Sequence, residues 1–276
     1  MNYTHFVLHS VCTTFRQNKK IGGTSAIKMS KTHFVLHSVC TIFVSRNKNW
    51  FYQNMKKNIS FQDIKNSKEI KTYIKQADAS LKALGYTEHS FAHCTKCAEV
   101  AGMLLKDLGY SDHEVELAKI AGYMHDIGNV VNRTNHAQNG AVMAFRLLDK
   151  TGMDYEDIAK VITAIGNHDE GTAFPVNEIA AALIIADKTD VRRSRVRNRA
   201  TIKEDIHDRV NYAVKSSEVS LDKKSGNVTL ILTIDTKICA VMDYFEIFLS
   251  RMLLCRKAAD VLGLHFKLNI NGVALL

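Results

Sequence analysis

Two residues of metal-binding type, His125 and Asp126, stand side by side where an apolar helix is expected to end. That helix is predicted to begin at a capping box formed by Ser111 and Glu114. Burying an unpaired histidine or aspartate costs roughly several kcal/mol, so a cation is the expected partner of the pair. A simpler interpretation stays open, in which His125 caps the negative end of the helix and Asp126 begins a turn.

Further residues of the same chemical type lie at the ends of other predicted helices. Helices that converge in a bundle can direct such side chains to one interior position. Three or four nitrogen and oxygen ligands hold one ion, whereas six with a bridging carboxylate suit two ions ~3.5–4 Å apart. A mixed His and Asp set favours a divalent transition metal (Fe, Mn, Zn, Ni or Co), and Mg is also possible. The additional candidates are His93, His136, His168 and Asp187.

With these residues the chain resembles the HD superfamily of metal-dependent phosphohydrolases. The first family histidine matches His93, and the signature doublet matches the His-Asp pair in the phrase GYMHDIGN, residues 122–129. The last family aspartate matches Asp187 in the phrase IADKTD, residues 185–190. The resemblance covers about residues 61–200 and implies a mainly α fold, an HD-domain helical bundle.

Two more matches point to the dinuclear members of that superfamily. His136 and His168 fall where HD-GYP phosphodiesterases and HD-type symmetric diadenosine-tetraphosphate hydrolases place extra histidines. The short spacing and the phrase IADKTD are more similar to the second group. The resemblance thus implies one or two divalent ions in a single centre.

The resemblance also implies the reaction and the role of each ligand. A phosphate ester or anhydride of a nucleotide or similar small phosphate compound would be cleaved by a metal-activated hydroxide. Asp126 would bridge two ions, with His93, His125 and Asp187 on one ion and His136 and His168 on the other. Asp169 or Glu170 would orient water or an imidazole, unless both are solvated loop carboxylates.

Cations that follow the last ligand are candidates for gripping substrate phosphates. Lys188 comes directly after that ligand, and Arg192 and Arg193 open a run of arginines. Arginine offers two parallel hydrogen bonds to a phosphate. The alternative is a solvated basic surface paired with the acidic residues of 204–208. Two histidine positions outside the pattern are expected elsewhere: His89 in an outer layer or in solvent, and His207-Asp208 at the surface.

The rest of the chain predicts three segments. Residues 55–215 form the helical HD domain, with helices expected over 64–84, 90–108, 111–124, 136–149, 155–166, 178–187 and 204–215. Residues 216–276 form a small α/β module, with a turn at 223–226, strands at 227–235 and 265–270, and a long helix at 238–262. That helix has more apolar surface than one small sheet needs, so a homodimer through this module is possible; burial on the chain's own helices is the alternative.

Residues 1–54 differ from everything after them. The phrase THFVLHSVCTTF at 4–15 returns as THFVLHSVCTIF at 32–43, which indicates a recent duplication. This basic leader contains no Asp or Glu and seven of the chain's 37 Lys and Arg, so the remainder carries 30 basic and 28 acidic residues and is close to neutral. We expect the leader to be disordered or outside the native fold.

Composition narrows the possible partners. Because residues 55–276 are close to neutral, their charge argues against general nucleic-acid binding. No apolar run approaches the ~18 residues of a membrane span. The six cysteines follow no disulfide framework, and the pair Cys94-x-x-Cys97 lies within a helical pattern, so reduced thiols in a cytoplasmic protein are expected. The leading function is the hydrolase; the alternatives are a non-catalytic, metal-containing nucleotide sensor and an RNA-binding protein.

Overall fold

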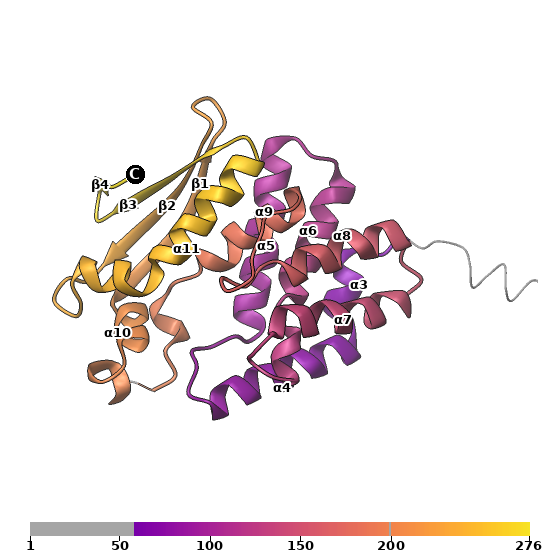
Figure 1. Ribbon diagram of the computed structural model, residues 1–276, viewed down its shortest axis with the longest axis horizontal. Coiled ribbons are helices and arrows are strands. Elements are labelled where there is room, and N and C mark those ends of the chain that lie inside the picture. The colour runs from indigo at the N-terminus through magenta and orange to yellow at the C-terminus, as the bar shows by residue number, and fades with distance from the viewer. Residues whose placement is uncertain (1–57, 199) are drawn as a thin grey trace, which may run out of the picture. The chain divides into compact units, whose positions relative to one another are not determined.

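Helices make up most of the described chain. The computed structural model describes residues 58–198 and 200–276, so the predictions made for the leader lie outside the described residues. The described part is mainly α, with nine α-helices and one small sheet near the C-terminus (Figure 1). No helix in these two ranges has the length and apolar composition needed to cross a bilayer.

The helical part follows the predicted order, with one helix divided in two. Where one helix was expected over 64–84, Ser67 ends the first piece and caps the next, since its extended ψ of 121° leaves the helical region and its hydroxyl accepts from the Ile70 N–H. The helices are α3 (Phe61–Asn66), α4 (Lys68–Ala83), α5 (Phe91–Leu108), α6 (Asp112–Met124), α7 (His136–Asp149), α8 (Tyr155–Gly166), α9 (Glu178–Lys188) and α10 (Ile206–Ala213), with 3-10 turns η1 (Ile127–Val130), η2 (Arg193–Arg195) and η3 (Ala200–Lys203).

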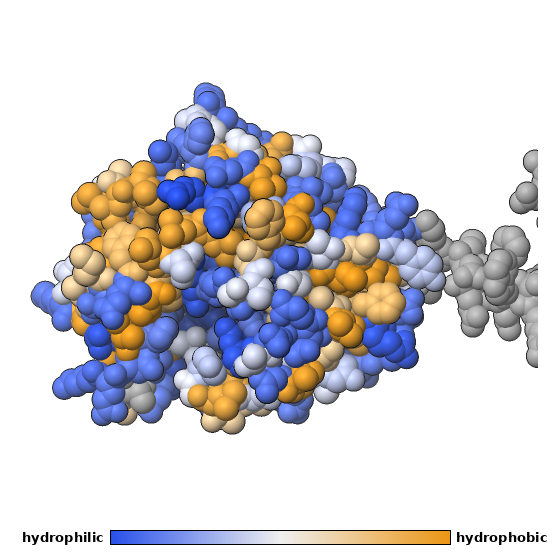
Figure 2. Space-filling model, in the orientation of Figure 1, coloured by the Kyte–Doolittle hydropathy of each residue, from blue (hydrophilic) through white to orange (hydrophobic). Residues whose placement is uncertain are grey.

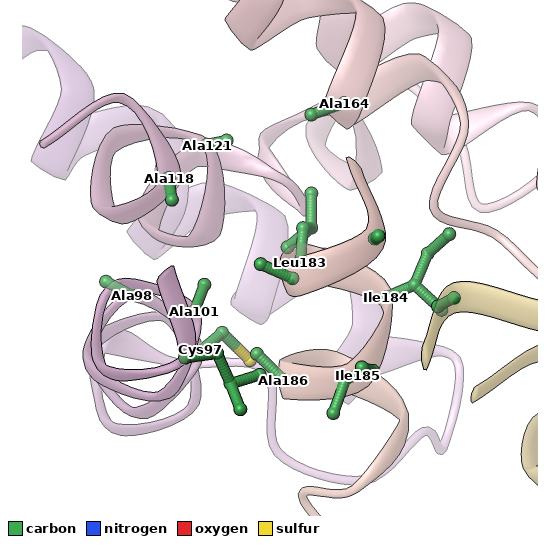
Figure 3. Packing of buried hydrophobic residues seen from close by; sticks show 14 of the residues in the cluster. Cys97, Ala98, Ala101, Ala118, Ala121, Ala164, Leu183, Ile184, Ile185 and Ala186 are labelled. Atoms are coloured by element: carbon green, nitrogen blue, oxygen red, sulfur yellow. The ribbon is translucent and has the colours of Figure 1, made fainter. Parts of the chain in front are cut away.

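Helix α9 forms the centre of the bundle. It packs against α5, α6, α8 and α11, and every residue from Ile179 to Ala186 is buried. Figure 3 shows Leu183 and Ala186 on the side of α9 that faces the small side chains of α5 and α6, while Ile184 points to the opposite side. Short side chains such as Ala98 and Ala121 let the helix axes approach closely. The end of α9, which includes Asp187, is thereby held against the beginning of α5.

Two glycines in the GYMHDIGN phrase are required by close packing. A Cβ on Gly122 would stand 2.8 Å from the backbone of Ala98, so only glycine lets α6 lie directly on α5. A Cβ on Gly128 would stand 2.0 Å from the carbonyl oxygen of His136 and 2.4 Å from the nitrogen of Gly140. The first contact sets the distance between α5 and α6, and the second sets the distance between η1 and α7.

The C-terminal segment forms the expected α/β module. Its elements are β1 (Val214–Asp222), β2 (Asn227–Ile234), α11 (Val241–Val261), β3 (His265–Ile270) and β4 (Val273–Ala274). The strand order is β1-β2-β3-β4, with β2 and β3 parallel and the other pairs antiparallel. Alternate residues of β2 and β3 are buried, and α11 lies between the sheet and the helical body (Figure 1).

The structure of this module agrees with some of the sequence predictions and corrects others. The turn at Asn271-Gly272 is confirmed, with positive φ of 53° and 84°. The helix expected over 204–215 is shorter, because β1 already begins at Val214. On α11, Tyr244 and Phe248 are buried, whereas Met242, Leu249 and Leu253 are exposed. The homodimer stays a prediction.

We predict that Gly128→Ala destabilises the fold. The new methyl group must displace the backbone of α7, and overpacking of this kind costs about 1–3 kcal/mol, which lowers the melting temperature by several degrees. Gly166→Ala is the matched control, because its Cβ would meet only Ala141 at 3.5 Å, an ordinary contact. Thermal unfolding followed by circular dichroism checks both variants, and equal melting temperatures would contradict the packing argument.

Candidate metal centre

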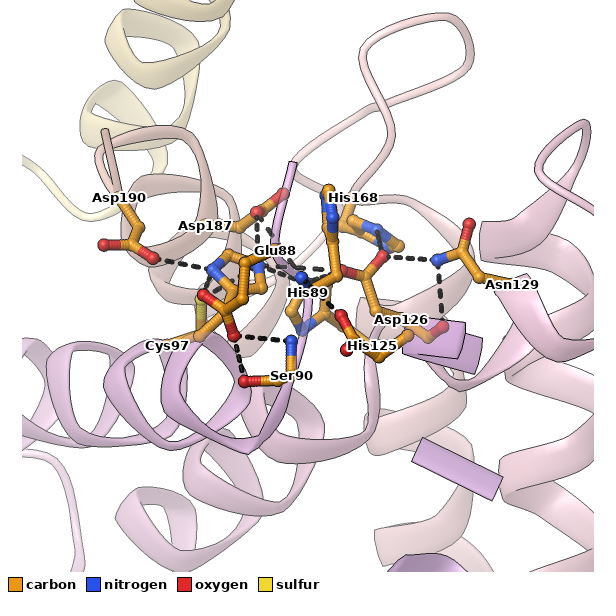
Figure 4. Close-up of polar contacts among 12 residues, drawn as sticks. Glu88, His89, Ser90, Cys97, His125, Asp126, Asn129, His168, Asp187 and Asp190 are labelled. Atoms are coloured by element: carbon orange, nitrogen blue, oxygen red, sulfur yellow. Dashed lines mark hydrogen bonds and ion pairs between the residues drawn. The ribbon is translucent and has the colours of Figure 1, made fainter. Parts of the chain in front are cut away.

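Six side chains from five elements of the bundle meet at one interior position. They lie in the first turn of α5, at the end of α6 and the residue after it, at the start of α7, just after α8, and in the last turn of α9. Figure 4 shows several of them pointing toward one another. The four histidines and Asp126 are at most 5% exposed. These are the six predicted ligands: His93, His125, Asp126, His136, His168 and Asp187.

The first half of the centre has three side chains around one point. The Nε2 atoms of His93 and His125 are 3.3 Å apart, and Asp187 Oδ1 lies 3.3 Å from the first and 3.7 Å from the second. Ligands ~2.1 Å from a common ion stand roughly 3.0–3.4 Å apart for octahedral to tetrahedral angles. The spacing therefore fits a single divalent ion between these atoms.

The second half is built around two more histidines. The Nε2 atoms of His136 and His168 are 3.2 Å apart. Asp126 Oδ1 lies 3.5 Å from the first and 4.0 Å from the second. The Oδ1 atom of Asp169 is 3.8 Å from His136 Nε2, at the edge of this group.

Asp126 connects the two halves, because each of its carboxylate oxygens faces a different one. Its Oδ2 lies 3.2 Å from His125 Nε2 and 3.6 Å from His93 Nε2, while Oδ1 faces the second half and accepts from Asn129 Nδ2 at 2.9 Å. Oδ2 is buried and has no hydrogen-bond partner among the described residues. A buried carboxylate oxygen without a donor is costly, and a cation at this position would remove the cost.

Each of the four histidines has its other ring nitrogen occupied by an acceptor. The Nδ1 of His125 lies 2.8 Å from the Gly122 carbonyl, that of His168 lies 2.6 Å from the Ile165 carbonyl, and that of His136 lies 3.0 Å from the Arg133 carbonyl. A carbonyl oxygen can only accept, so Nδ1 must donate. In the neutral ring the lone pair is then on Nε2, which faces the centre. This is the usual arrangement of metal-binding histidines.

The fourth histidine uses a carboxylate that the sequence argument did not identify as part of the site. His93 Nδ1 donates to Asp190 Oδ2 at 2.7 Å, and Asp190 is 1% exposed. Burial raises the pKa of Asp190, but the hydrogen bond and charge of His93 outweigh it and hold that pKa below its usual range. Its position three residues after Asp187, at the end of the phrase IADKTD, is the sequence signal that was available.

Of the CxxC pair, Cys97 lies against the centre: its Sγ and ligand atoms of His93, His125 and Asp187 are all within 4.8 Å of one another. Cys94 and Cys97 are buried in α5, and Cys97 Sγ packs 3.7 Å from the His93 ring nitrogens. Burial, followed by the charges of Asp187 and Asp190, raises the pKa of Cys97 well above its usual value, so the thiol keeps its proton. A thiol forms part of one wall of the centre.

The centre opens into a pocket of about 330 Å³, and its wall is formed by residues of the helical bundle and of the C-terminal α/β module. The side chains of the bundle include Asp126, His136, His168, Asp187 and Lys188. Phe248 and Arg251 of α11 also line it, so the C-terminal module supplies part of the wall. A hydrophilic recess is visible near the middle of the face in Figure 2.

Several residues besides the six ligands also line the pocket. His207 was expected at the surface and its side chain is 62% exposed, whereas Asp208, also expected at the surface, is only 9% exposed on the pocket wall. His89, expected in an outer layer or in solvent, lines the pocket with its ring centroid 5.4 Å from that of His93. The sequence pattern placed the first two on a polar helix, and no local signal shows which side of that helix faces the centre.

Lys188 is held firmly beside the centre. It is 4% exposed, and its Nζ lies 2.6 Å from Asp187 Oδ2 and 3.2 Å from Glu170 Oε2. Burial lowers the pKa of Lys188, but the charges of Asp187 and Glu170 raise it by more. The net pKa is above the ordinary value for lysine, so the ammonium stays charged. Glu170 is correspondingly ionised, with a pKa of about 2: burial raises it, and the charges of Lys188 and Arg251 lower it more.

The structure does not bring Arg192 and Arg193 to this pocket. Both line a different groove of about 640 Å³, together with Lys96 and Lys215. Arg192 Nε donates to Asp190 Oδ1 at 2.9 Å, and Arg193 Nε donates to the Tyr212 carbonyl at 2.6 Å. The reason is local: the extended Arg192 and the turn η2 direct both side chains away from the end of α9.

Comparison with known proteins agrees with this geometry. The HD domain family model matches residues 90–246, which extends beyond the bundle into α11. Uncharacterized protein MJ1020 of Methanocaldococcus jannaschii is 26% identical over 207 residues, 66% of this chain and 80% of that protein. Ribonuclease Y of Fervidobacterium nodosum is 27% identical over 142 residues, 50% of this chain and 24% of that enzyme. Ribonuclease Y 1 of Pediococcus pentosaceus is 36% identical over 89 residues, 31% of this chain and 15% of that enzyme.

We predict that metal affinity increases with pH. Burial by itself lowers the pKa of His125, but the carboxylates of Asp126 and Asp187 raise it to about 10 in the metal-free protein. A group with a raised pKa is protonated below that value, so an incoming cation must displace one proton, and apparent affinity rises roughly tenfold per pH unit up to that pKa. Calorimetric titration with Mn²⁺ between pH 7 and 9, in buffers of different ionisation enthalpy, measures the released proton. Affinity independent of pH would contradict the prediction.

Proposed function

The chain belongs to the HD superfamily of metal-dependent phosphohydrolases, and we propose that its centre binds two divalent ions and hydrolyses a phosphate ester or anhydride of a nucleotide or similar small phosphate compound. The observation that carries the proposal is the division of the Asp126 carboxylate. One oxygen faces His93 and His125, and the other faces His136 and His168. A carboxylate with one oxygen in each of two ligand groups is the arrangement expected of a bridge.

The donor set determines which ions fit. Four imidazole nitrogens and two carboxylates favour Fe, Mn, Zn, Ni or Co, while Mg²⁺ prefers an all-oxygen environment. A bound ion of this kind would lower the pKa of water from roughly 16 toward about 7 and so supply hydroxide at neutral pH. The centre is buried, which strengthens charge interactions inside it.

Several residues of the chain have roles in this proposal that do not require contact with the reacting phosphorus. Asn129 fixes the Asp126 carboxylate through Oδ1, and Asp190 fixes the His93 ring. Lys188 holds Asp187 Oδ2, which leaves Oδ1 directed at His93 and His125. Asp169, with its side chain 29% exposed and one oxygen near His136, is placed to accept a proton from water at the open edge of the centre.

A second candidate is a phosphodiester bond of RNA. Two observations favour it: several relatives are ribonucleases, and the groove with Arg192 and Arg193 adds four cationic side chains and one carboxylate, Glu218, to the surface. Most of these cations already have carboxylate or carbonyl partners, including Asp190 for Lys96 and Asp235 for Lys215. We therefore place the small phosphate compound first. A non-catalytic sensor is the remaining alternative.

We predict a metal stoichiometry that separates the two halves of the centre. Anaerobically purified protein should carry up to two ions per chain by elemental analysis. His168→Ala should lose one of them, and Asp126→Ala should lose both, because it removes the shared ligand. His113→Ala is the matched control, since that histidine is exposed and pairs with Asp157. A full complement of ions in Asp126→Ala would exclude this centre as the binding site.

We predict that hydrolysis depends on the same residues. Protein loaded with Mn²⁺ should release phosphate or nucleoside products from a panel of nucleotides, and Asp126→Ala should reduce kcat/KM by at least about 10³-fold, as loss of the metal implies. If RNA is the substrate, Arg193→Ala combined with Lys215→Ala, which leaves the Arg192–Asp190 pair intact, should raise KM for an oligoribonucleotide, with a steep salt dependence. The double variant should not affect nucleotide turnover. Complete inactivity of the metal-loaded protein on both panels would favour the sensor.

A further inference from the structure

Arg251 of α11 lines the same pocket as the metal centre, although it belongs to the C-terminal module. Its guanidinium is held at two places. Nε forms an ion pair with Glu170 Oε1, and the guanidinium carbon lies 4.5 Å above the centroid of the buried Phe248 ring. Within residues 58–198 and 200–276, no hydrogen bond or ion pair involves its two Nη atoms. The edge of the Arg251 guanidinium that carries the two Nη atoms is therefore available to bind another group.

The other cations of the pocket are occupied differently. Lys188 is enclosed by Asp187 and Glu170. Arg195 is 4% exposed and donates to the backbone carbonyls of Glu88 and Asp190. Arg133 donates from Nη1 to Asn129 at 3.3 Å and stacks on Tyr86. Arg251 thus has both terminal nitrogens available in a preset plane, which is the geometry that binds two phosphate oxygens at once.

The charges around Arg251 also favour an anion. Glu170 lies between Lys188 and Arg251 and interacts with both. Asp187 directs Oδ1 into the metal centre, so its negative charge is committed to the cation expected there. Lys188, Glu170 and Arg251 then carry one net positive charge among them, and the carboxylates of Asp205 and Asp208 line the same pocket from α10 and the residue before it. The net positive charge lies on the pocket wall, set back from the ligand atoms by the Asp187–Lys188–Glu170 chain of contacts.

We propose that Arg251 binds a second phosphate group of the substrate, next to the phosphate that is hydrolysed, so that the preferred substrates carry two or more linked phosphates. The inference rests on the proposed function, because it takes the scissile phosphate to lie at the metal centre. The C-terminal module in this arrangement determines specificity: α11 adds an anion site to a centre whose ligands all come from the bundle.

The test measures binding of two inorganic probes to the metal-loaded full chain by calorimetry. Imidodiphosphate carries two linked phosphates and a bridge that resists hydrolysis; inorganic phosphate carries one. Arg251→Ala should weaken imidodiphosphate binding by about tenfold or more and change phosphate binding by less than about threefold. Arg251→Lys keeps a cation beside Glu170 but lacks the two parallel N–H groups of a guanidinium. Its affinity for imidodiphosphate should fall by less than that of the alanine variant, and its affinity for inorganic phosphate should stay unchanged. Arg256→Ala is the control, since Arg256 is exposed on the same helix.

Two results would overturn the inference. Equal weakening of both probes would show that Arg251 acts only by holding Glu170 and Lys188, and unchanged binding of imidodiphosphate would show that its open edge binds no phosphate. If the alanine variant does not fold, the lysine variant gives the same comparison. Neither probe needs turnover, so absence of hydrolysis on every panel would reject the proposed function while the selectivity between the probes still decides the role of Arg251.

Discussion

A buried carboxylate with one unpaired oxygen is the constraint on which the rest of the structure depends. Asp126 lies at the point where α6 ends, surrounded by four imidazole rings whose Nε2 atoms point inward. Such a concentration of acceptors and lone pairs in the interior is costly in the absence of positive charge. Cations bound at this position would remove that cost, and the surrounding helices supply the contacts that keep the six side chains together.

The packing of the bundle sets the ligand distances. Glycine at position 122 lets α6 touch α5, and glycine at position 128 lets η1 touch α7. These two contacts flank the His125-Asp126 doublet and bring His93 to one side of it and His136 to the other. Helix α9, with its run of buried small and branched residues, brings Asp187 to the same place. Because packed helices are not continuously deformable, the centre gains precision from the core.

Electrostatic contacts join the C-terminal module to the centre. Asp187, Lys188, Glu170 and Arg251 form a chain of alternating charges from the end of α9 to the middle of α11. The apolar side of α11 packs on α9 and the sheet, while Phe248 and Arg251 extend to the pocket. The family match extends into this helix as well. The module is consequently part of the site's wall, in addition to covering the bundle.

The sequence by itself determined the helical class, the order of the elements and the identity of the six ligand candidates. Local signals suffice for the helices, since capping boxes and helical periodicity are read within a few residues. The ligand candidates came from the phrases around His93, His125 and Asp187 and, for His136 and His168, from the resemblance to the dinuclear members of the superfamily. Only the tertiary structure decided which partners those residues meet. Asp190 joins His93 from 97 positions away, and Arg251 reaches Glu170 from another module. Arg192 and Arg193 follow Asp187 closely along the chain, yet the extended backbone and the turn η2 direct them to a separate groove. Proximity in sequence fixes direction only inside a regular element, and beyond its end the path of the backbone decides.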